Sequence, residues 1–170
     1  MLAEVEQYVN MIEDLRGQVG DVVAGLPAKA LNWRPIAGQE SHATNSLAVL
    51  ATHVAGAEHF WIAEVIAHQP PTRERETEFR VVSDEALALQ ERLVDVGRQT
   101  REILGALEAA TLEEDRTVRA GTAQERIVPV RWAILHVIDH TALHLGHMQL
   151  TRQLWEGGAA HGGPRWFERV

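Results

Sequence analysis

The stretch His136-Val137-Ile138-Asp139-His140-Thr141-Ala142-Leu143-His144-Leu145-Gly146-His147 carries four histidines at steps of four, four and three residues. On an α-helix these steps correspond to azimuths of roughly 40°, 80° and 20° from the first histidine, so the four imidazoles share one arc. Most of the residues between them are apolar, which indicates a buried helix. The sequence therefore predicts imidazoles that line the inside of a helical protein.

Apolar residues at three- and four-residue steps predict four long helices joined by polar connections. The expected helices cover residues 2–26, 45–67, 83–110 and 129–156. Ser46 (or Asn45) and Ser83 are expected to cap the second and third helices, and Pro129 suits the first turn of the fourth. The connection 111–128 is expected to be a long loop or a short ribbon. This pattern favours an all-α four-helix bundle, with residues 1–170 as a single domain.

Composition excludes several classes of protein. The chain has 170 residues, of which 45% are hydrophobic and 24% charged, as in ordinary globular domains. Its net charge of −8 leaves no basic surface for nucleic acid, and no apolar run is long enough to span a membrane. The chain contains no cysteine, which excludes thiolate zinc sites and cysteine nucleophiles; we expect a cytoplasmic protein.

A metal ion would account for several imidazoles on a buried helix. Unsatisfied imidazole nitrogens are costly to bury, and neutral imidazole is the commonest ligand of transition metals. His136 and His147 are about 16 Å apart along the helix axis, so one ion can bind only one adjacent pair. The third ligand must come from another helix, and His53 is the best candidate because it lies on an apolar face. An apolar pocket lined by imidazoles, without an ion, is the alternative.

The remaining histidines are weaker candidates. His59 lies about 120° around the helix from His53 and is expected to face outward or an interface. His42, His68 and His161 lie in loop-like sequence. The histidine spacing also excludes the H-E-x-x-H zincin pattern and the ferritin-like di-iron pattern.

Two segments together resemble the DinB/YfiT-like family. They are His53-Val54-Ala55-Gly56-Ala57-Glu58-His59-Phe60-Trp61 and the stretch from His140 to His147, with Asn32-Trp33-Arg34-Pro35 before the second helix as a further likeness. The resemblance extends from the first helix to Trp155. It implies an up-down-down-up four-helix bundle that holds a divalent metal through three histidines. Matched residue by residue, these metal ligands are His53, His140 and His144.

The resemblance also implies a range of functions. The family includes S-transferases and isomerases that use mycothiol or bacillithiol, domains of sulfoxide synthases, and members without an assigned reaction. Three neutral imidazoles leave an open position on an ion, which is the catalytic arrangement. We therefore expect a Zn, Ni or Fe ion, a small-molecule substrate, a low-molecular-weight thiol cofactor, and thiol S-transferase or hydrolase chemistry. The alternatives are a non-catalytic metal-binding stress-response protein and a helical interaction domain.

Several residues near the expected site are candidates for further roles. His147 stands where many relatives have glutamine, so it is a candidate acid–base or substrate-positioning residue, and His136 is a candidate hydrogen-bond donor behind the ligands. Trp33, Trp61 and Trp155 are candidates for a pocket mouth, with core packing as the alternative. Arg34 and Arg152 are candidates for binding a thiol's anionic groups, with a solvated surface as the alternative.

The apolar pattern of two helices predicts association. The first expected helix is apolar along its full length, and the third carries apolar residues on more than one side: Leu87, Leu89, Leu93, Val94 and Val96. Surplus apolar surface usually marks a partner surface, so a twofold homodimer is expected. In the alternative, the connections 27–44 and 111–128 cover the surplus and the protein is a monomer.

Overall fold

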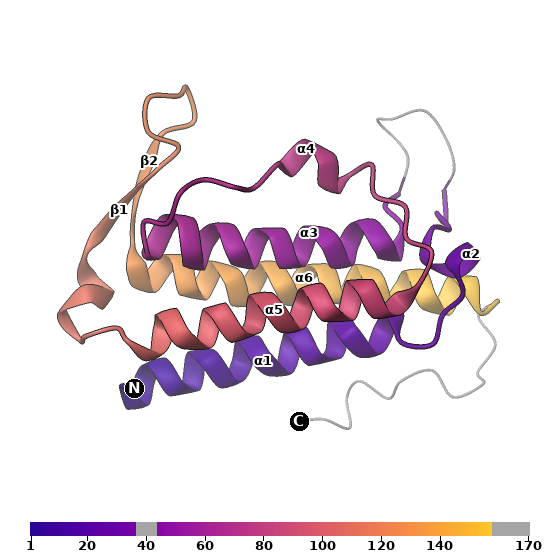
Figure 1. Cartoon of the computed structure of the whole chain (residues 1–170), viewed down its shortest axis with the longest axis horizontal. Coiled ribbons are helices and arrows are strands. Elements are labelled where there is room, and N and C mark those ends of the chain that lie inside the picture. The colour runs from indigo at the N-terminus through magenta and orange to yellow at the C-terminus, as the bar shows by residue number, and fades with distance from the viewer. Residues whose placement is uncertain (37–43, 158–170) are drawn as a thin grey trace.

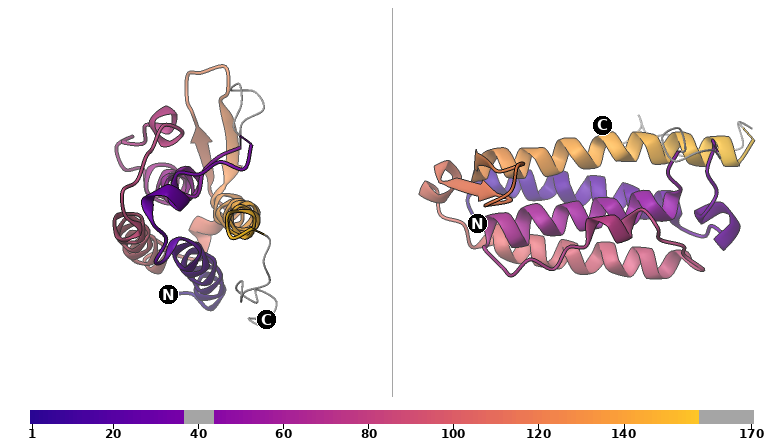
Figure 2. Two further views of the ribbon diagram at one scale, coloured as in Figure 1. Left: turned by 90° about the vertical axis from the view of Figure 1, so that its right-hand side faces the viewer. Right: turned by 90° about the horizontal axis from the view of Figure 1, so that it is seen from above.

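Four long helices form the body of the protein. The computed structural model describes residues 1–36 and 44–157. The long helices are α1 (Ala3–Val23), α3 (Leu47–His59), α5 (Ala86–Gly105) and α6 (Val130–Trp155). α1 and α3 each pack against both α5 and α6, and the four helices lie side by side (Figures 1 and 2). None of the helices in the described part of the chain is long and apolar enough to cross a membrane.

The helix directions match the predicted up-down-down-up order. α1 and α6 run in one direction, whereas α3 and α5 run in the other (Figure 1). Because α3 and α5 are parallel, the connection 67–85 returns along the length of the bundle and carries the short helix α4 (Arg75–Glu78). A second short helix, α2 (Ala28–Leu31), follows α1. The all-α fold expected from the sequence is therefore confirmed.

The helix ends differ from the prediction at several positions. Ser46 caps α3 as expected, since its Oγ accepts a hydrogen bond from the Val49 N–H at 3.3 Å. The prediction that Ser83 caps the third helix is wrong, because α5 begins at Ala86 and the Ser83 hydroxyl donates to the Glu85 carbonyl at 2.8 Å. The Ser83 N–H is bound by Asn32 Oδ1 at 2.9 Å, so this serine serves a loop contact.

The connection before α6 contains a short ribbon, one of the two expected forms. After the 3₁₀ turn η2 (Ala110–Glu113), strands β1 (Asp115–Val118) and β2 (Arg126–Pro129) pair antiparallel, with Val118 opposite Arg126. Arg116 anchors the ribbon, since its side chain is buried and its Nε donates to the Ile66 carbonyl at 3.3 Å. The ribbon thereby stands against the end of α3 and the start of α6 (Figure 1).

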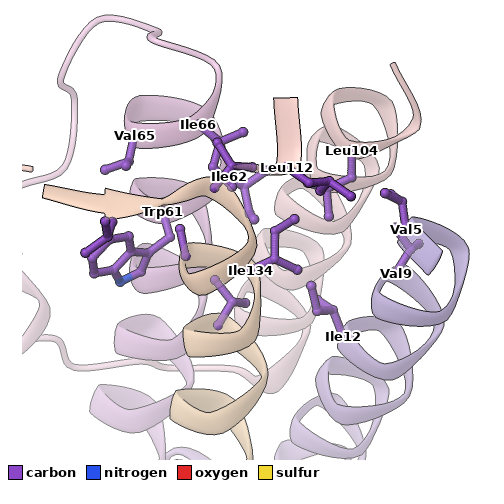
Figure 3. Close-up of a cluster of buried hydrophobic side chains, with 14 of the residues drawn as sticks. Val5, Val9, Ile12, Trp61, Ile62, Val65, Ile66, Leu104, Leu112 and Ile134 are labelled. Atoms are coloured by element: carbon purple, nitrogen blue, oxygen red, sulfur yellow. The ribbon is translucent and has the colours of Figure 1, made fainter. Parts of the chain in front are cut away.

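Helix α3 continues into a π-helical segment, η1 (Phe60–Ile66), which the sequence pattern did not predict. Wider π-helical turns redirect side chains and are frequent at functional sites. Trp61 and Ile62 of this segment pack in one of two apolar clusters, together with Val5, Val9 and Ile12 of α1 (Figure 3). The other cluster lies further along the bundle and includes Val19, Leu50 and Met148.

A polar layer lies between the two apolar clusters. The fully buried Glu58 carboxylate accepts hydrogen bonds from Arg16 at 2.7 Å and from Thr100 at 2.6 Å, which ties α3 to α1 and α5. Burial raises the pKa of Glu58 against the opposing effects of Arg16 and Thr100. A Cβ atom at Gly97 would lie 2.3 Å from the Arg16 guanidinium, so glycine is required where Arg16 crosses α5. The candidate histidines lie at about this level of the bundle.

Candidate metal centre

The bundle brings three of the predicted histidines together. His53 lies on α3, and His140 and His144 lie one turn apart on α6; each offers one ligand atom, and these atoms all lie within 4.8 Å of one another. The Nε2 atoms of His53 and His140 are 3.1 Å apart. The ring centroids of His140 and His144 are separated by 4.4 Å, and each lies 5.0 Å from that of His53. Three nitrogen donors therefore converge from two helices.

A carboxylate from the long connection orients His53. Glu78 Oε2 lies 2.8 Å from His53 Nδ1. Arg73 donates hydrogen bonds to both carboxylate oxygens of Glu78, at 2.7 and 2.9 Å. Since a carboxylate accepts hydrogen bonds, Nδ1 carries the proton and Nε2 presents its lone pair toward His140. Arg73 Nη2 also lies 3.3 Å from His53 Nδ1, but Nη2 donates a hydrogen bond to Glu78 Oε2 at the shorter distance of 2.9 Å.

Gly56 makes room for this carboxylate. A Cβ atom built at Gly56 would lie 2.0 Å from Glu78 Oε1 and 2.8 Å from its Cδ. Any side chain at this position of α3 would therefore displace Glu78 from His53. The glycine three residues after His53 is part of the architecture of the site.

Two of the three imidazoles, those of His140 and His144, have a lower proton affinity than ordinary surface histidines. Burial lowers the pKa of His140 to about 3, with further effects of the neighbouring His144 and His53. Burial likewise lowers the pKa of His144 to about 4. Burial would raise the pKa of Glu78, but hydrogen bonds from Arg73 and His53 outweigh it and the pKa is lowered. At neutral pH the site therefore combines the neutral imidazoles of His140 and His144 with the ionised carboxylate of Glu78.

His144 has an unsatisfied nitrogen. Its Nδ1 atom is buried and has no hydrogen-bond partner within residues 1–36 and 44–157. Buried polar atoms are nearly always paired, so this nitrogen needs a partner beyond those that the described residues supply. A cation that prefers nitrogen ligands fits this donor set.

A cavity of about 350 Å³ opens beside His53 and His140. His136 also lines it and stacks on Trp132, with ring centroids 4.9 Å apart and planes at 10°. Burial lowers the pKa of His136, and the nearby Arg126 acts in the same direction. His136 thus lies on the wall of the cavity, where its ring centroid is 5.8 Å from that of His140.

His147 lies on the other side of His144. Its ring centroid is 5.6 Å from that of His144, its side chain is exposed, and it lines a separate cavity with Leu50 and Leu154. The structure therefore does not bring His147 into the cavity beside His53 and His140. Its acid–base role stays a prediction.

The other histidines lie away from the three. His59 is half-buried, and its ring nitrogens lie 2.9 Å from Gln99 Oε1 of α5 and 2.9 Å from Thr72 Oγ1. His68 is exposed at the end of η1. His42 and His161 lie outside the described residues.

The structure places the candidate tryptophans and Arg152 in different surroundings. Trp61 lines the cavity beside the histidines, whereas Trp33 and Trp155 pack against each other, 5.8 Å between centroids. Arg152 donates to the Asp21 and Val22 carbonyls and so holds α6 to α1. It is not among the residues that line the cavity beside the histidines.

The sequence pattern did not identify Glu78, Arg73 or Arg126 as site residues. Glu78 and Arg73 lie in the charged connection 67–85, where no periodicity indicates which side chains turn inward. Arg126 lies on a short strand whose position against the bundle depends on Arg116. Only their tertiary contacts identify them.

Comparisons with known proteins agree with this fold. A family model described as "Mycothiol-S-transferase" matches residues 7–157. A crystal structure described as the conserved protein of a locus from Enterococcus faecalis has a TM-score of 0.72 at 17% identity, covering 92% of this chain and 99% of that chain. At this identity the likeness concerns the fold alone. No curated protein matches the chain.

Proposed function

This chain belongs to the mycothiol-S-transferase family, within the DinB/YfiT-like group, and we propose that it is a metal-dependent thiol S-transferase whose divalent ion is held by His53, His140 and His144. The observation that carries the proposal is the convergence of three imidazole donors within 4.8 Å beside a cavity of about 350 Å³. Family membership supports the thiol chemistry, and the histidine geometry supports the metal.

The donor set fits a divalent transition metal. A metal ligand must be neutral imidazole, and burial lowers the pKa values of His140 and His144 to about 3 and about 4. The contact by which Glu78 orients the His53 ring is a further feature of such sites. Three nitrogen ligands suit Zn, Ni or Fe, and supply in the cell selects among them.

The protein's own groups prepare the site for reaction. When bound, a divalent ion supplies positive charge that favours the thiolate form of a thiol. Glu78 holds the proton on His53 Nδ1, and Arg73 holds Glu78 in place. Phe60 and Trp61 supply apolar surface beside His53 and His140, which limits access of water to the thiol.

Two other functions are consistent with the same donors. A hydrolase would use water in place of the thiol, and a non-catalytic metal-binding protein would hold the ion without turnover. Assay with low-molecular-weight thiols and an electrophile distinguishes the S-transferase from both alternatives, because only the S-transferase requires the thiol.

The proposal is tested by metal content and by turnover. We expect purified protein to bind about one equivalent of divalent metal and to join a thiol to an electrophile only when metal is present. His53→Ala, His140→Ala and His144→Ala should each remove nearly all of the metal, whereas His68→Ala, an exposed control, should retain it. Full metal occupancy in His140→Ala would refute the ligand assignment.

The acid–base role of His147 has its own test. If His147 exchanges a proton with the substrate, His147→Gln should lower kcat and alter its pH profile while metal occupancy stays complete. An unchanged pH profile of kcat would reject this role.

We also propose that the protein is a cytoplasmic homodimer. Most of the apolar stripe of α1 is buried in the bundle. Val94 on α5 and Leu143 and Leu150 on α6, however, each have more than half of their surface exposed. Exposed apolar side chains of this kind favour association. Sedimentation at micromolar concentration should show a species of twice 18.9 kDa, and a single species at 18.9 kDa would contradict the dimer.

A further inference from the structure

Several arginine side chains line the cavity beside the candidate metal centre, although the protein as a whole is acidic. The chain has a net charge of −8. The cavity is nevertheless lined by Arg73, Arg75, Arg119 and Arg126, and no aspartate or glutamate is among the lining residues of the described chain.

Three of these arginines already have polar or aromatic partners. Arg73 is bound to Glu78. Arg75 lies over the Phe79 ring and 3.6 Å from Glu76, and Arg119 donates to the side chain of Gln124. The carboxylates of Glu78 and Glu76 offset part of the positive charge of Arg73 and Arg75, and these contacts leave the three arginines few free N–H groups.

Arg126 is different, because its contacts are with aromatic faces. Its guanidinium lies 5.0 Å from the Trp61 ring centroid and 4.8 Å from that of Trp132. Within residues 1–36 and 44–157 it has no carboxylate partner. Aromatic faces attract a guanidinium while leaving the N–H groups at its edge free, and those edges match a planar carboxylate in a two-point contact.

The surroundings hold Arg126 in this position before any ligand arrives. Trp132 is itself stacked on His136, at 4.9 Å between centroids. The ribbon that carries Arg126 is fixed by the buried Arg116, which bonds the Ile66 carbonyl, and by the buried Val118 opposite it. A group held in advance binds its ligand with less loss of conformational entropy.

We propose that Arg126, framed by Trp61 and Trp132, is a subsite for a carboxylate on the small molecule that reacts beside His53 and His140. This inference rests on the proposed S-transferase function and names the substrate class of the same cavity. The carboxylate belongs either to the thiol or to its electrophilic partner, and both sources share the chemistry that Arg126 recognises.

Binding is tested first on metal-free protein, where no turnover takes place. Succinate and its neutral analogue succinamide are titrated while the fluorescence of the tryptophans beside Arg126 is recorded. Succinate should give a saturable change and bind about 10- to 100-fold more tightly than succinamide, the gain expected from a charge-assisted two-point contact. Arg126→Gln should abolish this preference, and Arg126→Lys should restore part of it.

A matched control removes the same charge elsewhere. Arg98 is an exposed arginine of α5, paired with Asp95 at 2.9 Å. Arg98→Gln should bind succinate as the unmodified protein does. Equal losses in Arg98→Gln and Arg126→Gln would mean that only overall charge matters, and would overturn the subsite.

Turnover by metal-loaded protein then identifies which reactant carries the carboxylate. N-acetylcysteine is compared with N-acetylcysteamine as the thiol, and iodoacetate with iodoacetamide as the electrophile, each rate being divided by the uncatalysed rate. In the reaction the sulfur bonds to the CH₂ carbon, iodide leaves with the electron pair of the C–I bond, and the thiol proton passes to solvent. If the carboxylate-bearing compound of one pair reacts faster, and Arg126→Gln abolishes this preference, that pair identifies the reactant whose carboxylate Arg126 binds.

The outcomes separate this inference from the function on which it rests. Succinate binding that depends on Arg126, without thiol transfer in any combination, would refute the S-transferase and leave the subsite. Thiol transfer without a carboxylate preference in either pair, and without succinate binding, would refute the subsite and leave the S-transferase.

Discussion

Glu78 Oε2 lies 2.8 Å from Nδ1 of His53, although the two residues are separated by 25 positions in the chain. The contact joins the connection that carries α4 to the middle of α3. It fixes the ring of His53, so that Nε2 faces His140 at 3.1 Å. The connection 67–85 thus contributes a side chain to the candidate site in addition to joining the two parallel helices α3 and α5.

Removing the charge of Glu78 should weaken metal binding. We expect Glu78→Gln to lower the affinity for divalent metal about 10- to 100-fold, because the carboxylate fixes the orientation of the His53 ring. Competition with a chelator of known affinity measures the change. Glu76→Gln makes the same substitution on an exposed side chain of the same connection and should leave the affinity unaltered. Equal affinities for the two variants would remove Glu78 from the site.

A methyl group at Gly56 should have an effect of the same kind. Gly56→Ala introduces a Cβ atom 2.0 Å from Glu78 Oε1, which must then move away from His53. We expect weaker metal binding in the chelator assay, while the helix is retained by circular dichroism. Gly146→Ala is the matched control, because a Cβ atom there meets nothing within 4 Å. If Gly56→Ala bound metal like Gly146→Ala, the space beside Gly56 would be irrelevant to the site.

The buried Arg16–Glu58 pair should dominate the stability of the polar layer. The two side chains are only 10% and 0% exposed, so Arg16→Met leaves the Glu58 carboxyl group buried without its main partner. We expect the free energy of unfolding to fall by about 3–5 kcal/mol in urea denaturation. Arg101→Met breaks the exposed pair with Glu13 and should cost much less. Similar losses for both variants would contradict a buried role for Arg16.

The metal-free protein should lose stability in acid. His140 and His144 have folded pKa values of about 3 and about 4, below the ordinary value of 6.5, so the unfolded state binds more protons between these limits. Their contribution is complete above about pH 6.5 and declines as the pH falls toward 3. Urea denaturation from pH 7 to pH 4 measures it. A His140→Ala/His144→Ala variant should show a shallower pH dependence over this range, and an equally steep one would assign the effect to other groups.

The grouping of His53, His140 and His144 could be predicted from the sequence for a definite reason. Residues four apart on one helix lie on the same face, so His140 and His144 are neighbours whenever α6 forms. The inward position of His53 follows from the apolar face of α3. The resemblance to a known family singled out these three histidines among the nine of the chain.

Periodicity and local backbone preferences in the sequence predict the four helices and the histidine face of α6, whereas for residues 111–128 they left a loop or a ribbon open. The tertiary structure was needed to show that Glu78 reaches His53, that Glu58 pairs with Arg16, and that Arg126 lies against the rings of Trp61 and Trp132. The first two contacts join residues 25 and 42 positions apart, and the third brings a short ribbon against η1 and the start of α6. No repeating pattern marks such residues, since their neighbours are set by how the connections fold back over the helices.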